Sequence, residues 1–390
     1  MKGFLVVVLL CLLYLSFGPI ITSATTFDVT SYGAKGDGDT DDSEAFLRAW
    51  NDLCRDKLPK PTLIVPLDKT FLISPVAFKG PCKSPTVTIK LLGKITAPKT
   101  LDGWKGCINK NYWIYFTSVQ GLTIQGPGQI DGQGAIWWRK KMTTKTKTCN
   151  RPSALHFNAC DGLRLRGTTH INSPMLHISI NGCKDVDVGN LQIIAPGDSP
   201  NTDGIDIGRS SHVNIHNSNI QTGDDCVAIN GGVYDINVTR VIGSLGENGG
   251  HDTVEQVHVE KCNITGTKNG LRIKTVPYGS GYARQIVFRD IQLVNVENPI
   301  IIDQNYCDHY ENAFCQAPPN ASAIDVSNVM YTNIYGSSAT KQAITFNCSG
   351  KYNCTDIVTK KVEITGQDEF SYCKNVRGKF VDTTPPVKCY

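Results

Sequence analysis

Val213-Asn-Ile215 and Ile236-Asn-Val238 share a short pattern, with apolar residues at alternate positions, that decides how this chain folds. The pattern also occurs at Leu163-Arg-Leu165, Val186-Asp-Val188, Val257-His-Val259 and Ile286-Val-Phe288. From one copy to the next, the first residues are 23, 27, 23, 21 and 29 positions apart. Alternation is typical of half-buried strands, and a long repeat separated by Gly, Asn and Asp is typical of stacked coils. The sequence therefore predicts an all-β parallel β-helix rather than a sandwich of hairpins, whose turns would recur at shorter intervals.

One amphipathic helix is predicted near the start of the coils. Asp41-Asp-Ser43 can cap the segment 44–53. The apolar face of this helix would consist of Phe46, Leu47, Trp50 and Leu53. The acidic run 37–42 does not match a calcium-binding loop, because its sixth position is Asp42 rather than Gly and its twelfth is Arg48 rather than Glu. We therefore interpret this segment as a capping helix that closes the open end of the stack.

The N-terminal segment 1–24 is predicted to be a cleaved secretory signal peptide. Lys2 is its only charge, and an apolar stretch over positions 4–21 is followed by small residues, Thr22-Ser-Ala24. A retained membrane anchor is the alternative, because the stretch is nearly long enough to cross a bilayer. Pro19 and the small residues favour cleavage. No later segment is apolar for long enough to cross a membrane, so no membrane contact is expected after the signal is removed.

Residues 25–390 contain no linker-like segment and are interpreted as one domain, since a stacked architecture grows by adding coils. The formal net charge is +4, and it falls to +3 (4 minus 1) when Lys2 is removed with the signal. This weak balance argues against nucleic-acid binding and is compatible with an acidic polysaccharide. We expect a monomer.

Fifteen cysteines, or fourteen without Cys11 of the signal, predict disulfide bonds in a secreted protein. Three pairs lie close together along the chain: Cys307 with Cys315, Cys348 with Cys354, and Cys373 with Cys389. Asn-x-Ser/Thr sequons agree with passage through the secretory route. They occur at Asn237, Asn263, Asn320, Asn347 and Asn353.

Three stretches, 199–207, 223–229 and 271–275, carry residues from which a catalytic site could be built. Asp224 follows Asp203 by about the length of one coil, and Arg272 follows Asp224 by about the length of two. Coils of this length would bring the stretches onto one surface. The spacing therefore predicts a cluster of carboxylates that faces a basic clamp.

Asp224 and Asp225 are adjacent, so a fully extended segment would point their side chains to opposite sides. A turn or bulge at Gly223 could bring both carboxylates to the same side. Crowded carboxylates repel one another, which raises the pKa of one of them and keeps it protonated. One protonated acid and ionised partners are what the inverting hydrolysis of a glycosidic bond requires.

These stretches and their flanks resemble the plant-type polygalacturonases, a family of glycoside hydrolases that cut the anionic backbone of pectin. Similar segments extend along almost the whole chain, at residues 27–38, 126–134, 172–174 and 301–307. The resemblance implies a single-stranded right-handed parallel β-helix that hydrolyses α-1,4-galacturonosyl linkages with inversion. It implies a secreted protein of the cell wall, an acidic polysaccharide substrate, and neither a cofactor nor a metal.

The resemblance also implies a role for each candidate residue. Asp224 would be the general acid, while Asp203 and Asp225 would position and deprotonate water. Asn201 would support Asp203, and an Arg fork suits the carboxylate of galacturonate. The residues expected to bind the substrate are Asn201, Arg272, Lys274 and Tyr306.

One part of the family pattern is missing. The family carries a Cys-Gly-Pro-Gly-His-Gly segment before an Ile-Gly-Ser-Leu-Gly stretch, whereas here residues 238–241 run directly into Ile242-Gly-Ser-Leu-Gly246. The family's histidine has no counterpart, and Cys226 loses its expected partner, so a free thiol is predicted. His251 and Glu247 are candidate substitutes, but a solvated Gly-rich turn is the favoured interpretation. We expect a folded chain with a locally loosened cleft wall and weakened activity.

Two other functions remain open. A galacturonan-binding pseudoenzyme would hold the polymer without cutting it; the missing histidine favours this function, and the intact aspartates favour hydrolysis. A pectate lyase shares the β-helix, but it eliminates rather than hydrolyses and typically requires calcium. The Asn-Thr-Asp and Asp-Asp motifs argue against a lyase.

Overall fold

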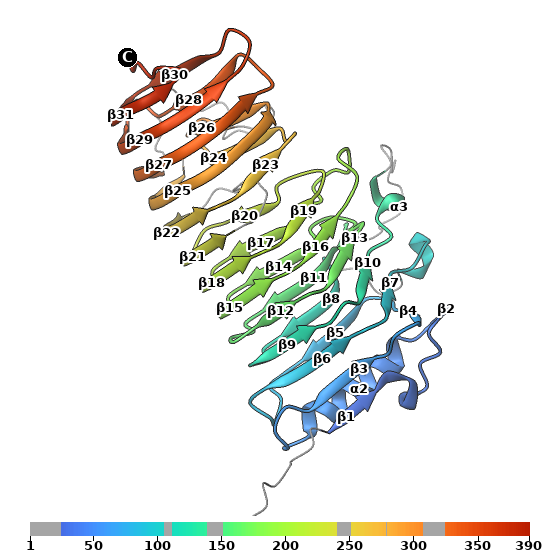
Figure 1. The fold of residues 1–390 in the computed structure, drawn as a ribbon. Helices are drawn as coiled ribbons and strands as arrows, with labels where there is room; N and C mark the ends of the chain where they lie inside the picture. Colours follow the sequence, from blue (N-terminus) through green and yellow to red (C-terminus); the bar gives the residue numbers. More distant parts are fainter. Residues whose placement is uncertain (1–24, 105–110, 139–150, 240–250, 278, 307–323) are drawn as a thin grey trace, which may run out of the picture.

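A computed structural model describes residues 25–104, 111–138, 151–239, 251–277, 279–306 and 324–390 of the chain. The described strands stack in parallel, coil upon coil, into an elongated molecule (Figure 1). The predicted signal peptide, residues 1–24, lies outside the described residues, as does the segment 240–250 beside the missing family histidine. No helix in the described ranges is long and apolar enough to cross a membrane.

One sheet follows the molecule from end to end, and each of its main strands pairs in parallel with the strand of the next coil. In order, these strands are β1 (Thr26–Asp28), β3 (Thr62–Val65), β6 (Val87–Leu91), β9 (Leu122–Gln125), β12 (Arg164–Arg166), β15 (Lys184–Gly189), β18 (Ser211–His216), β21 (Val233–Thr239), β22 (His251–Glu260), β25 (Ser280–Val296), β27 (Asp325–Ser338), β29 (Cys354–Thr365) and β31 (Val376–Thr384). Strand β23 (Asn263–Thr265) also pairs with β25.

Three shorter sheets complete the walls of the coil in the described part of the chain. The first contains β2 (Asp37–Asp41), β4 (Thr70–Leu72), β7 (Lys94–Thr96), β10 (Gln129–Asp131), β13 (Thr169–Ile171), β16 (Gln192–Ile194) and β19 (Asn219–Gln221). The second contains β5 (Val76–Lys79), β8 (Tyr112–Thr117), β11 (Ser153–Asn158), β14 (Ile178–Asn181), β17 (Ile205–Gly208) and β20 (Val227–Ile229). The third contains β24 (Asn269–Lys274), β26 (Asn298–Asp303), β28 (Gln342–Asn347) and β30 (Phe370–Lys374).

The register of the long sheet confirms the repeat predicted from the sequence. Val186 pairs with Val213, Val213 with Ile236, Ile236 with Val257, and Val257 with Ile286. All five side chains are buried, so the apolar residue of each coil lies on that of the coil below. A slip of one residue would turn every one of them outward, which is why burial fixes the register.

Single residues within the long sheet adopt a left-handed backbone conformation. Asp185, His212 and Asp235 have φ values of 56°, 54° and 57°, and each precedes a buried apolar residue of the repeat. Asn, Asp and His occupy this region more readily than most residues. Each of the three residues lies inside its strand, β15, β18 or β21, directly before the apolar pair of that coil.

The predicted capping helix is α2 (Ser43–Arg55), and it packs on the first coils. Phe46 and Trp50 are buried, and their rings contact Phe71 and Phe78 at centroid distances of 5.5 and 5.2 Å. Leu47, expected on the same face, is only half-buried. The short helix α3 (Ala135–Trp138) and the 3₁₀ turns η1 (Val29–Tyr32) and η2 (Leu101–Gly103) complete the helical segments described.

The acidic run before α2 organises the helix entry. The Asp41 carboxylate accepts a hydrogen bond from the Ser43 backbone N–H at 3.0 Å. The buried Asp42 carboxylate accepts bonds from the backbone N–H groups of Lys35 at 2.7 Å and Gly36 at 3.1 Å. Within the described residues, the N-cap residue Asp42 makes no side-chain hydrogen bond to the helix, so the acidic run contacts the start of α2 through the bond that Asp41 accepts from Ser43.

The shortened coil closes in the long sheet, and among the described strands the second and third sheets are not paired with each other. Strand β21 pairs in register with β22, Val233 with Val254 and Ile236 with Val257, at the short offset expected from the sequence. Strand β20 is the last described strand of the second sheet and β24 is the first of the third, and residues 240–250, which lie between them in the chain, are outside the described residues. The interruption therefore falls beside the predicted catalytic residues.

Two of the predicted disulfides are present, Cys348–Cys354 and Cys373–Cys389. Cys307 and Cys315 lie outside the described residues. A third bond, Cys54–Cys82, joins the end of α2 to a distant loop, at a sequence separation of 28 that is too long for the sequence to suggest. Cys226 is free and buried, as predicted.

Candidate active site

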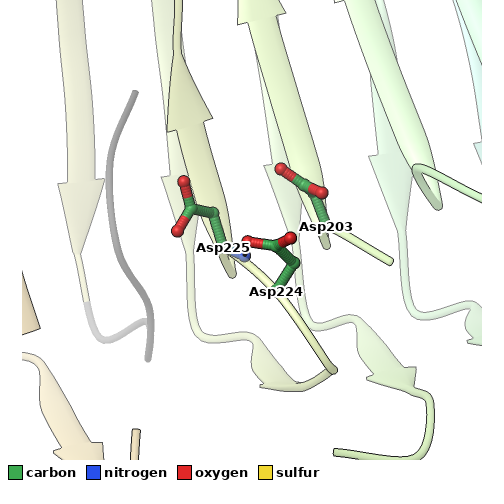
Figure 2. A group of neighbouring side chains, drawn as sticks. All are labelled: Asp203, Asp224 and Asp225. Atoms are coloured by element: carbon green, nitrogen blue, oxygen red, sulfur yellow. Dashed lines mark hydrogen bonds between the residues drawn. The ribbon is translucent and has the colours of Figure 1, made fainter. Parts of the chain in front are cut away.

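Asp203, Asp224 and Asp225 meet on one wall of the coil (Figure 2). Asp203 lies just before β17 and the other two lie just before β20, so neighbouring coils supply them. One carboxylate oxygen of each residue lies within 4.8 Å of the others. Because β17 pairs with β20, residues that are one full coil apart along the chain lie next to each other in space.

The turns before these two strands pack tightly against each other. The Thr202 hydroxyl accepts a hydrogen bond from the Gly223 backbone N–H at 3.0 Å and lies 2.6 Å from the Ser199 hydroxyl. A Cβ atom on Gly223 would lie 2.0 Å from the Ser199 carbonyl oxygen, which leaves room only for glycine. The turn expected at Gly223 thus exists, and it directs Asp224 and Asp225 into the same cluster.

The basic residues come from β24, beyond the interruption. Arg272 is buried, and its Nη2 donates to both carboxylate oxygens of Asp225 at 3.0 Å. Lys274 is half-buried, with Nζ 4.6 Å from the ring centroid of Tyr306, and the Arg272 guanidinium carbon lies 5.7 Å from the same ring. The sequence predicts Arg272 as a clamp for a substrate carboxylate, and this role stays a prediction. In the structure Arg272 neutralises the buried carboxylate of Asp225.

Asn201 is exposed and has a left-handed backbone, with φ of 54°. Its Nδ2 donates to the Asp224 carboxylate at a long distance of 3.5 Å. Its Oδ1 accepts a short bond of 2.6 Å from Arg151. The sequence predicted support for Asp203, whereas the hydrogen bond of this amide to the cluster is made with Asp224.

Burial and mutual repulsion make the cluster retain protons. Burial, followed by the charges of Asp224 and Asp225, raises the pKa of Asp203 to about 8. Burial and the charge of Asp225 also raise the pKa of Asp224 above its ordinary value. The predicted repulsion between carboxylates is therefore present at both aspartates, but burial is the larger cause of each shift, and the total shift is large at Asp203.

These residues line a groove of about 1490 Å³ on the wall that includes the interruption between β20 and β24. Asp206 and Asn230 lie on one side, while Lys268 and Lys274 lie on the other. Pockets for small molecules typically measure about 300–1,000 Å³. The larger volume and the mixture of charges suit a long, polar ligand.

The sequence model of Glycosyl hydrolases family 28 matches residues 54–384 of this chain. This chain belongs to that family. A probable polygalacturonase from Arabidopsis thaliana is 45% identical over 96% of this chain and 83% of its own length. Polygalacturonase-2 from Solanum lycopersicum is 38% identical over 90% of this chain and 78% of its own length. The family resemblance seen in the sequence is confirmed, and the chain is a glycoside hydrolase of the polygalacturonase family.

Solved structures of low identity support the fold. An exopolygalacturonase from Thermotoga maritima superposes with a TM-score of 0.75 at 21% identity, covering 92% of both chains. An endo-xylogalacturonan hydrolase from Aspergillus tubingensis gives a TM-score of 0.77 at 21% identity, covering 94% of this chain and 99% of that one. The family 28 chain is therefore a right-handed parallel β-helix, as the resemblance implied.

Sequence reasoning overlooked several residues of the family 28 site. Asp206 accepts bonds from Asn230 Nδ2 at 2.9 Å, and burial raises the pKa of Asp206 to about 6 despite these bonds. Its position could have been inferred, since it belongs to the stretch quoted around Asp203 and falls within β17. Arg151 and Arg209 carry no comparable sequence signal, because only the stacking of coils brings them near the groove.

A buried histidine, His177, also contacts the backbone of the site. His177 is fully buried, with Nδ1 3.0 Å from the Asp203 carbonyl oxygen and Nε2 3.3 Å from the Ser173 backbone N–H. Burial lowers the pKa of His177 to about 4. His177 therefore holds the backbone at Asp203 and is no substitute for the missing family histidine. The side chains of Glu247 and His251 lie outside the described part of the chain.

Asp203, Asp224 and Asp225 are also close enough together to contact a cation. The charge of Asp225 is offset by Arg272, and burial and repulsion raise the pKa of Asp203 to about 8 and that of Asp224 above its ordinary value.

Proposed function

We propose that this protein is a secreted polygalacturonase that hydrolyses α-1,4-galacturonosyl linkages of de-esterified pectin, with inversion, in a plant cell wall. The observation that carries the proposal is the proton-retaining carboxylate cluster in a long groove that also presents Lys274 beside Tyr306. Inverting hydrolysis needs a protonated carboxyl and a carboxylate on opposite sides of the bond that breaks. Family membership and relatives named as polygalacturonases support this choice over other glycosidases.

Asp224 is the general acid of the proposed reaction. Its carboxylate is the most exposed of the three and faces the groove. The carboxylates of Asp203 and Asp224 lie within 4.8 Å of each other, and burial and repulsion raise the pKa of both. In the reaction, Asp224 gives its proton to the departing glycosidic oxygen while water attacks the anomeric carbon from the opposite face. The products are a new reducing end and a new hydroxyl group.

Asp225 is the base in this proposal, and Asp203 positions the water. The ion pair with Arg272 holds the Asp225 carboxylate toward the cluster. Asp225 takes the proton that the water loses as it attacks, so proton uptake and proton donation balance. The family resemblance implies that Asp203 and Asp225 together position and deprotonate the water. We assign only the positioning role to Asp203, because its raised pKa makes its carboxyl retain its own proton.

Lys274 and Tyr306 form the proposed site for a galacturonate residue next to the bond that is cut. The ammonium group offers a charged partner for the sugar carboxylate, and the ring offers a face for the sugar. In this proposal Arg272 acts mainly by holding the carboxylate of Asp225. Methyl esterification of the carboxylates should therefore weaken binding.

Purified mature protein incubated with polygalacturonate tests the proposal. We expect new reducing ends without products that absorb ultraviolet light, and their loss in Asp224→Asn. Asp235→Asn, which changes a partly exposed aspartate on β21, is the matched control and should remain active. Unsaturated products would point to a lyase, and binding without cleavage would establish the galacturonan-binding pseudoenzyme instead.

Secretion and the monomeric state belong to the same proposal. Residues 1–24 have the features of a signal peptide, and the relatives named above are plant proteins. Expression in plant cells should release a protein whose N-terminus lies close to Thr25. Light scattering on that material measures its mass, and a dimer would contradict the expected monomer.

A further inference from the structure

Arg151 is linked to the Asp224 carboxylate through the side chain of Asn201. The guanidinium donates from Nη1 to the Pro200 carbonyl oxygen at 2.8 Å and from Nη2 to Asn201 Oδ1 at 2.6 Å. On its other side, Asn201 Nδ2 donates to Asp224 Oδ2 at 3.5 Å. The three residues thus form a chain of contacts that leads from the segment just before β11 to the groove.

The chemistry of the guanidinium group determines which atom of the Asn201 amide faces Asp224. Arg has only donors, so the atom of Asn201 that it contacts must be the amide oxygen. The amide nitrogen is then directed toward Asp224. Without Arg151, the amide could rotate and present its oxygen to the Asp224 carboxylate, exchanging an attraction for a repulsion.

The same guanidinium holds the turn that carries Asn201. Asn201 has a φ of 54°, a conformation that is unfavourable for most residues and is tolerated by Asn. The bond to the Pro200 carbonyl oxygen fastens the residue just before it. Arg151 therefore controls both the backbone and the side chain at this position, and a fork-shaped donor can contact both oxygens at once.

We propose that Arg151 is a positioning residue, which orients the Asn201 amide toward Asp224 and thereby sets the proton affinity of the general acid. The proposal rests on the proposed function for the role of Asp224, but the contacts do not depend on it. Asp224 also experiences Asp225, Asp203, Lys274 and Arg272, all of which stay in place when Arg151 is changed. Arg151→Ala removes a positive charge and an oriented donor, and both losses favour the protonated form of Asp224.

The test measures the titration of Asp224 directly, in the full mature chain. Carbon-13 NMR of labelled aspartate carboxyls follows Asp224, assigned by the signal that disappears in Asp224→Asn. In Arg151→Ala we expect the Asp224 titration to move upward by about half a pH unit or more. Arg151→Lys, which keeps the charge but lacks the fork, should restore part of the shift. The matched control Arg166→Ala breaks an ion pair with Asp187 on the long sheet and should leave Asp224 unchanged.

Kinetics on polygalacturonate provide the second measurement. Arg151→Ala should lower kcat about tenfold or more with little change in KM, because the acid rather than the sugar loses its alignment. The alkaline limb of its pH profile should move to higher pH, following the raised pKa of Asp224. A residue that only stabilises the fold would lower the amount of active protein without moving this limb.

Each outcome decides the proposal. An unchanged Asp224 titration in Arg151→Ala, or an equal shift in Arg166→Ala, overturns it. If Arg151→Ala does not fold, Arg151→Gln provides the same test, because it removes the charge and the fork while keeping a polar side chain, and an unaltered titration there also overturns the proposal. If the wild-type protein releases no reducing ends, the proposed function fails, whereas the NMR titration still decides whether Arg151 orients Asn201 toward Asp224.

Discussion

The Asp203 side chain lowers the stability of the fold near neutral pH and also belongs to the proposed catalytic site. It is surrounded by Asp224, Asp225 and Asp206, and burial together with these charges raises its pKa to about 8. A carboxyl whose pKa is raised in the folded state stabilises the fold below the ordinary pKa, about 4, and this contribution is lost as the pH rises toward the raised value. The cluster is therefore a local source of instability near neutral pH, a common property of catalytic sites.

Asp203→Asn should therefore stabilise the protein at pH 7 by more than about 1 kcal/mol while changing its stability little at pH 4. The substitution removes a buried carboxyl group whose ionisation is unfavourable in the folded state, and the amide that replaces it has approximately the same shape. Urea unfolding at the two pH values measures the difference. The opposite sign is expected for Asp187→Asn, because hydrogen bonds from Arg166 and His216 outweigh the effect of burial and lower the pKa of Asp187. Equal effects of Asp203→Asn at both pH values would contradict the assigned pKa.

Arg272 stabilises the fold, in contrast to Asp203, because its positive charge neutralises the buried carboxylate of Asp225. Its side chain is 9% exposed and that of Asp225 is 6% exposed. Removing one member of a buried ion pair typically costs about 3–5 kcal/mol, since the other charge is left without compensation. Arg272→Ala should therefore lower the free energy of unfolding by an amount in this range, in addition to any effect on activity. Arg289→Ala, at a pair in which the arginine is 46% exposed, is the control and should have a much smaller effect.

Among the elements, helix α2 is responsible for closing the N-terminal end of the stack. Stacked coils leave an apolar interior open at each end, and a capping element is required there. The buried face of α2 supplies Phe46, Trp50 and Leu53, and the Trp50 indole N–H donates to the Lys79 carbonyl oxygen at 3.2 Å. The Cys54–Cys82 bond fastens the C-terminal end of the helix.

Trp50→Ala should lower the free energy of unfolding by about 3–5 kcal/mol, because it leaves a cavity between α2 and the aromatic residues below it. Leu47→Ala is the comparison within the same helix. Leu47 is only half-buried, and its removal should cost about 1 kcal/mol or less. Chemical denaturation of both variants measures the difference, and similar losses would show that α2 does not cap the core through Trp50.

At the scale of the whole molecule, the groove combines acidic and basic groups in a way that suits an anionic polymer. The cations that line it, Arg209, Lys268 and Lys274, come from elements on both sides of the interruption between β20 and β24. The carboxylates at its centre would repel a polyanion if all of them were ionised. Retained protons and the Arg272 pair reduce that repulsion where the chain must approach most closely.

Binding of polygalacturonate should therefore weaken as salt is added. Raising the ionic strength from about 0.05 to 0.5 M shortens the screening length several-fold, so KM should rise several-fold with a smaller change in kcat. Steady-state kinetics at fixed pH measures both. Lys268→Ala should reduce the salt dependence, whereas Lys379→Ala, on β31 at the far end of the long sheet, should not. A KM independent of salt would contradict an electrostatic contribution to binding.

The sequence alone determined the fold class, the capping helix, the coil length and the three stretches that form the site. This was possible because alternation of apolar residues and their spacing are local properties, and burial then fixes the register, as in the pairs from Val186 to Ile286. The tertiary structure alone decided which side chains pair within the site. Arg272 binds Asp225, Arg151 reaches Asn201, and burial raises the pKa of Asp203 most clearly. These outcomes depend on distances of a few ångströms between coils and on the exclusion of water, and neither quantity is encoded in the spacing of residues along the chain.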